Sequence, residues 1–274
     1  MPRSDGSVIW IASYPKSGNT WARFLVCNLV FGPQESAAAL NHLAPDIHEL
    51  GDSFELPKEP LFLKTHFPYH NDLPLAAHSA AAIYLVRDPG DVMLSNFHYA
   101  KRSGALPEDV ALSHYVDQYL TERGDRRWLK RGIGRWDDHV RSWLALKHPF
   151  PLLLLRYEDL VGDAAHGARQ ICAFLGLTRS PTEIEQAVAG ASFTRMREIE
   201  EADIRARQVG IFYKQYLRQP IDAGLRFMRS GRAGEAAEVL PAAQQRAVRT
   251  VFGGVMQQLG YVDAGEKLRP VARS

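Results

Sequence analysis

A lysine, a glycine and two hydroxyl side chains occur within five consecutive positions near the N-terminus. We call the surrounding residues 13–21 the Lys16 loop: Ser13-Tyr14-Pro15-Lys16-Ser17-Gly18-Asn19-Thr20-Trp21. An apolar run typical of a buried strand, residues 8–12, precedes this loop, and a helical run, residues 22–31, follows it. A turn from strand to helix directs free backbone N–H groups at an anion, and Lys16 adds positive charge there. The loop is therefore predicted to hold a phosphate-like group, with Trp21 as a surface on which an aromatic base can stack.

The order of these residues differs from the loop that binds nucleoside triphosphates. That loop has the pattern G-x-x-x-x-G-K-[ST], in which the lysine follows the second glycine. Here Lys16 precedes Gly18, and no glycine stands at the first position. A P-loop kinase of nucleotides or small molecules stays an alternative, because Ser17 and Thr20 could contact a metal ion. Magnesium-dependent ATP binding would favour it.

A histidine follows the apolar run at residues 61–64. His66 can accept a proton from a hydroxyl near neutral pH, and Lys64 lies two residues before it. A lone histidine is more often structural than catalytic. The neighbouring lysine and the position at a strand end favour a catalytic base.

An arginine ends a third apolar run, residues 82–86. The guanidinium of Arg87 can hold a phosphate through paired N–H donors. The following Asp88-Pro89 is a good helix start, and Ser95 lies two turns inside that helix. Each residue alone has an ordinary structural explanation, but together they indicate a second phosphate site.

The elements that must position these residues form a strand and helix alternation typical of a parallel α/β sheet. Strands are predicted at residues 8–12, 61–64, 82–86 and 152–155, and helices at 22–31, 90–101, 107–122, 135–147, 159–175, 181–189 and 241–259. Ligands of such sheets bind outside the carboxyl ends of the strands, and Lys16, His66 and Arg87 stand just after predicted strands.

Two long connections separate these elements, at residues 32–60 and 204–232. The second carries seven basic residues and interleaved aromatic ones, including Phe212 and Tyr216, against one acidic residue. A solvated basic surface and a mobile lid over an anionic aromatic ligand explain this composition equally well. We place the lid, if formed, around residues 204–226.

Composition narrows the class of protein. The 274 residues are 46% hydrophobic and 23% charged, with a net charge of +2, which disfavours a protein that coats nucleic acid. The only cysteines, Cys27 and Cys172, form no disulfide framework, so we expect the reducing cytoplasm. The apolar run at residues 8–12 is too short for a signal peptide, and no run is long enough to span a membrane.

The Lys16 loop resembles the 5′-phosphosulfate loop of the cytosolic-type sulfotransferases, which use 3′-phosphoadenosine 5′-phosphosulfate (PAPS) as sulfuryl donor. Residues 64–68 resemble the family's K-T-H-x-P segment, and residues 87–95 its R-D-P-x-D-x-x-x-S motif. Segments at residues 134–140, 156–160, 192–196 and 227–234 resemble four further family strings in the same order. The resemblance covers nearly the whole chain. Residues 10–15 in particular resemble bacterial members of the family.

The resemblance implies a PAPS-dependent sulfotransferase with a single P-loop-like domain over residues 1–274 and no metal. It makes His66 the general base, Lys16 the stabiliser of the leaving group and Lys64 a support for the transferring group. The implied donor-binding residues are Lys16, Ser17, Gly18, Asn19, Thr20, Trp21, Arg87, Ser95, Tyr157, Ser192, Phe193, Phe227, Met228, Arg229, Ser230 and Gly231. The implied product is 3′-phosphoadenosine 5′-phosphate (PAP), and the partner is a small-molecule hydroxyl acceptor, phenolic or a natural product.

Several positions depart from the family pattern. Ser230 stands where the family has a lysine, and Ala236 where it has a tryptophan. A non-catalytic nucleotide-binding homologue is therefore a second alternative. The dimer motif K-x-x-x-T-V of many animal members is not matched near residues 237–242, so the oligomeric state is open.

Overall fold

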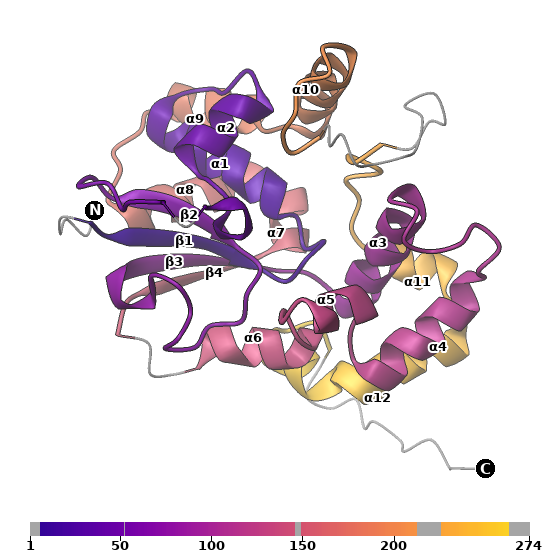
Figure 1. The fold of residues 1–274 in the computed structure, drawn as a ribbon. Helices are drawn as coiled ribbons and strands as arrows, with labels where there is room; N and C mark the ends of the chain where they lie inside the picture. The colour runs from indigo at the N-terminus through magenta and orange to yellow at the C-terminus, as the bar shows by residue number, and fades with distance from the viewer. Residues whose placement is uncertain (1–5, 52, 146–148, 213–225, 263–274) are drawn as a thin grey trace.

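The structure is a computed structural model that describes residues 6–51, 53–145, 149–212 and 226–262 (Figure 1). Its centre is a parallel four-stranded sheet in the order β2-β1-β3-β4. The strands are β1 (Val8–Ser13), β2 (Leu61–Thr65), β3 (Ser79–Val86) and β4 (Leu152–Arg156). All four predicted strands are confirmed, although β3 begins three residues before its predicted start at Ala82.

Alternation along the strands divides the hydrophobic core between the two faces of the sheet. Trp10 and Tyr84 point to one face, and Ile9 and Ile11 to the other. The first face is covered by α3 (Pro89–Arg102), α4 (Leu112–Glu122), α5 (Arg126–Lys130), α6 (Trp136–Leu144), α11 (Glu235–Val239) and α12 (Ala242–Gln258). The second is covered by α1 (Asn19–Phe31), α2 (Ala37–Leu43), α7 (Tyr157–Gly162), α8 (Ala164–Leu175), α9 (Pro181–Gly190) and α10 (Phe193–Arg205). In Figure 1, α1, α2 and α9 lie above the sheet and α6 and α12 below it.

Several predicted elements need correction. The helix predicted at residues 159–175 is two helices, because Asp163 interrupts it and caps α8 by accepting from the His166 N–H at 2.8 Å. The predicted connection at residues 32–60 contains α2, capped by Ser36, and the 3₁₀ turn η1 (Ile47–Glu49). A second 3₁₀ turn, η2 (Ala76–His78), precedes β3.

The helix predicted from residue 107 begins only at Leu112. Helix α10 was not predicted, and its last turn includes the start of the predicted lid. Residues 213–225, most of that lid, lie outside the described residues. Both cysteines are buried free thiols. Within the described ranges, no helix combines the length and apolar character that crossing a membrane would need.

Candidate functional site

The Lys16 loop connects β1 to α1 through two residues in the left-handed region. Lys16 has φ 73° and Gly18 has φ 97°. A Cβ added at Gly18 would lie 2.6 Å from the ring of Tyr157, so a side chain there would meet both strain and a clash. The structure thus explains the glycine at position 18 by the close approach of the Tyr157 ring.

Two polar residues of the loop, Asn19 and Ser17, differ in their hydrogen bonding. The amide of Asn19 donates to Ile11 O at 3.1 Å and to Ser13 Oγ at 3.2 Å, which ties the start of α1 to β1. Ser17 is buried, and its hydroxyl has no hydrogen-bond partner in the described part of the chain. Asn19 Oδ1 is likewise buried without a partner there, and because such groups are costly, a ligand bound at the loop would explain both.

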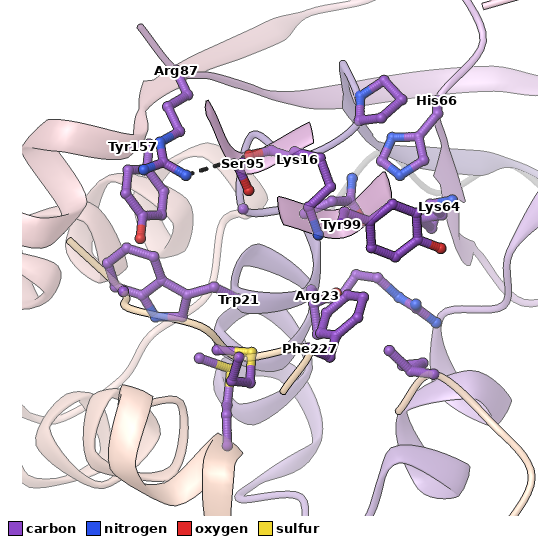
Figure 2. A pocket seen from close by; sticks show the side chains of 18 of the residues that line it. Lys16, Trp21, Arg23, Lys64, His66, Arg87, Ser95, Tyr99, Tyr157 and Phe227 are labelled. Atoms are coloured by element: carbon purple, nitrogen blue, oxygen red, sulfur yellow. Dashed lines mark hydrogen bonds between the residues drawn. The ribbon is translucent and has the colours of Figure 1, made fainter. Parts of the chain in front are cut away.

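A cavity of about 1010 Å³ opens at the carboxyl ends of β1, β2 and β3. Every predicted catalytic or donor-binding residue except Ser17 lines it. In the view of Figure 2, Lys16 lies between Arg87 and Tyr157 on one side and His66 and Lys64 on the other. The structure thus brings residues from elements and loops far apart in the chain to one space, as the parallel topology predicts.

Lys16 lies among cations and aromatic rings. Its Nζ is 4.5 Å from the ring centre of Tyr99 and 4.5 Å from that of Phe227. Burial, together with the nearby charges of Arg102 and Arg87, lowers the pKa of Lys16 to about 7. A lysine in this setting gains most from an anion, because an anion would offset both the burial and the repulsion.

His66 is oriented for accepting a proton at one ring nitrogen. Its Nδ1 donates to Ser13 O at 2.7 Å, and a carbonyl can only accept, so Nε2 is left as the basic nitrogen. Burial and the charge of Lys64 hold the pKa of His66 well below 6.5. The imidazole is therefore neutral at pH 7, in the form that a base requires.

Helix α6 holds the chain around His66 in place. His139 Nε2 donates to His66 O at 3.0 Å, and Trp143 Nε1 donates to Phe67 O at 3.0 Å. His139 Nδ1 in turn accepts from the hydroxyl of Tyr84 at 2.9 Å. Burial lowers the pKa of His139 to about 3, so it stays neutral and keeps both bonds. The sequence placed His139 in a family segment and Trp143 only in the predicted helix 135–147, and it connected neither with His66.

Lys64 is already paired. Its Nζ lies 2.7 Å from Asp46 Oδ2, and both side chains are largely buried. Burial lowers the pKa of Lys64 to about 8, although the Asp46 carboxylate acts against that shift. Lys64 therefore lines the cavity as one half of an ion pair with Asp46. The sequence did not predict this partner.

Arg87 joins the strand edge to the C-terminal part of the chain. It donates to Asp91 Oδ2 at 3.1 Å and to Arg232 O at 2.8 Å, and its guanidinium lies 4.3 Å from the ring centre of Tyr157. Asp91 also accepts from the backbone N–H groups of Gly234 and Ala236, each at 2.8 Å. The aspartate of the R-D-P-x-D motif therefore positions the arginine and the segment that contains Arg229.

A buried glutamate positions the start of that segment. Glu200, fully buried on α10, accepts from the backbone N–H groups of Phe227 at 2.5 Å and Met228 at 2.9 Å. Nothing in the spacing around Glu200 predicts this contact, because α10 itself was not predicted. Next to it, a Cβ at Gly231 would lie 2.5 Å from the ring of Phe193, so this glycine and this ring depend on each other.

The comparisons with known proteins identify the family of the chain. The sulfotransferase domain model matches residues 7–260 of the chain. Rat sulfotransferase 2A1 is 29% identical over 254 residues, which cover 90% of this chain and 84% of the rat protein. The guinea pig 3-alpha-hydroxysteroid sulfotransferase is 29% identical over 198 residues, covering 69% of this chain and 65% of that protein.

Solved structures share the fold. Mouse sulfotransferase SULT7A1, complexed with PAP, aligns with a TM-score of 0.69 at 23% identity and covers 93% of this chain and 86% of its own. A retinol dehydratase in complex with retinol and PAP aligns with a TM-score of 0.65 at 20% identity, covering 99% and 85%. At these identities the likeness establishes the α/β fold with a central parallel sheet.

Proposed function

Because the chain belongs to the sulfotransferase domain family, we propose that this sulfotransferase moves a sulfuryl group from PAPS to a hydroxyl of a small-molecule acceptor. One observation carries the proposal. Lys16 and the unprotonated Nε2 of His66 face one cavity, which Arg87 and Arg229 also line. A sulfuryl donor with a second phosphate and an acceptor hydroxyl need these two kinds of group.

The residues present fit PAPS. The Lys16 loop, with its unpartnered Ser17 hydroxyl, would hold the 5′-phosphosulfate. Arg87, whose Nε has no partner in the described part of the chain, would hold the 3′-phosphate together with Ser95 and Arg229. Trp21, Tyr157 and Phe193 would provide aromatic surfaces for the adenine. The PAP bound in two structural neighbours supports an adenine nucleotide as the ligand.

The chemistry then divides between two residues of the chain. His66 removes the acceptor's proton through Nε2 while Ser13 O holds Nδ1–H. Lys16 stabilises the negative charge that grows on the departing oxygen, from a position fixed by the loop before the reaction begins. When bound, PAPS supplies the sulfuryl group and leaves as PAP. Lys64, tethered to Asp46, adds positive charge near the transferring group.

A transfer assay tests the proposal. The protein is incubated with radiolabelled PAPS and a panel of hydroxyl acceptors, including phenols, sterols and retinoids. The panel follows the relatives and structural neighbours, which include a hydroxysteroid sulfotransferase and a retinol dehydratase in complex with retinol. Label transfer with stoichiometric PAP is expected; tight PAP binding without transfer to any acceptor would favour the non-catalytic homologue.

Binding of PAP should take up a proton at Lys16. With a pKa of about 7 in this setting, Lys16 is largely neutral at pH 8, and a bound 5′-phosphate raises its pKa towards the ordinary 10.5. Binding at pH 8 therefore draws a proton from buffer, and affinity falls as pH rises above about 7. Calorimetry in two buffers of different ionisation enthalpy measures this uptake. Equal enthalpies in both buffers would contradict it.

The acidic limb of the pH–rate profile should lie below the ordinary histidine range. Neutral His66 is the active form, and a pKa well below 6.5 keeps it neutral to lower pH. We expect kcat at saturating PAPS to stay level as pH falls from 7 to 6.5, because the donor then keeps Lys16 protonated. An acidic inflection at or above 6.5 would remove His66 as the base or its burial as the cause. Saturating PAPS is needed because in kcat/KM the protonation of free Lys16 has the opposite sign and would offset an acidic fall.

A further inference from the structure

The two arginines expected at the 3′-phosphate are both paired with carboxylates of the chain. Arg87 pairs with Asp91, and Arg229 pairs with Glu235. Glu235 receives both terminal nitrogens of Arg229, Nη1 at 3.2 Å to Oε1 and Nη2 to Oε2, and also the hydroxyl of Ser230 at 2.8 Å. This two-point geometry is the one with which a guanidinium binds a phosphate.

The two carboxylates differ in how firmly they are held. Asp91 also accepts two backbone N–H groups, from Gly234 and Ala236, so its place is fixed by the main chain. In the described part of the chain, the carboxylate of Glu235 accepts only from the side chains of Arg229 and Ser230. Asp91 is therefore a structural tie, whereas Glu235 can leave Arg229 by a side-chain rotation.

We propose that Glu235 determines how strongly the site selects donors that carry a 3′-phosphate, because its carboxylate occupies the guanidinium face of Arg229 that this phosphate needs. The inference rests on the proposed function. A 3′-phosphate must displace Glu235 or lie beside it, and two anions side by side repel. Ser230 intensifies this competition, because a lysine at that position would offer Glu235 a second cation and free Arg229.

The test compares two nucleotides that differ only in the 3′-phosphate. Dissociation constants of PAP and AMP are measured by calorimetry for the unchanged protein and for E235Q, which keeps size and hydrogen bonding but removes the charge. We expect E235Q to bind PAP about 10-fold or more tightly, with AMP affinity within about twofold. E238Q is the matched control, because Glu238 lies on the same helix and pairs with the exposed Arg232 at 2.6 Å. It should change neither constant.

A second variant keeps the test decisive if E235Q fails to fold. S230K should shift PAP affinity in the same direction as E235Q and leave AMP affinity unchanged. Weaker PAP binding in E235Q, or equal shifts for PAP and AMP, would show that Glu235 positions Arg229 instead of competing for it. The proposed function fails separately, if the unchanged protein binds neither nucleotide and transfers no sulfuryl group.

Discussion

Replacing His66 with alanine should lower kcat by about 10²–10⁴, the range for loss of a general base. The residue's Nδ1 is committed to Ser13 O, so Nε2 is the nitrogen through which it can act, and alanine removes that nitrogen without adding bulk. PAP affinity should change little, because Arg87, which we propose binds the 3′-phosphate, lies on the other side of Lys16 from His66 (Figure 2). Initial rates with saturating PAPS, together with PAP titration, separate the two effects.

His70 supplies the matched control for this substitution. It follows His66 by four residues and is exposed, and it does not line the cavity. H70A should keep kcat within about twofold, the ordinary effect of a surface change. Full activity in H66A would exclude His66 as the base. Loss of PAP binding in H66A would instead point to collapse of the segment that α6 holds through His139 and Trp143.

Replacing Lys16 with methionine should lower kcat by about 10²–10³, the effect of removing one preorganised group that stabilises developing charge. Methionine preserves most of the length and the apolar contacts with Tyr99 and Phe227, so the charge is the main loss. Lys16 has a positive φ, and methionine should meet the same backbone strain there because both residues carry a Cβ. Single-turnover rates measure the chemical step directly.

Lys101 is the control for Lys16. It lies on α3, and its Nζ donates to Glu108 O on the protein surface. K101M should leave the single-turnover rate within about twofold. If K16M reduced PAP affinity and left the chemical step unchanged, Lys16 would be a binding residue that contacts the phosphate equally before and during the reaction. K16M should also abolish the proton uptake expected on PAP binding at pH 8.

The sequence predicted the sheet well because buried parallel strands read as short continuous apolar runs. Residues 8–12 and 152–155 needed only one added residue each to become β1 and β4. Helix boundaries were less predictable where a cap decides them. Asp163 divides one helical pattern into α7 and α8, and Ser192 starts α10 in a segment with no strong apolar period.

The candidate site was predictable where its residues follow strands or belong to short motifs, as Lys16, His66 and Arg87 do. The supporting contacts were not predictable, because they join positions far apart in the chain. Glu200 meets Phe227 through its backbone, and His139 meets His66 across 73 residues. No local pattern encodes such pairs. The pairing of Arg229 with Glu235 is closer in sequence, but its meaning depends on the cavity that Arg229 lines.

The contacts of Asp91 have a consequence for the order in which the sheet and the cavity form during synthesis. All four strands are complete once Arg156 has been synthesised, but Asp91 needs the N–H groups of Gly234 and Ala236, 143 and 145 residues later. A ribosome-bound chain that ends before residue 227 can form the sheet but lacks one wall of the cavity. Because loops of such length close slowly, donor binding should be acquired late in synthesis, as a single step that follows emergence of residues 227–236.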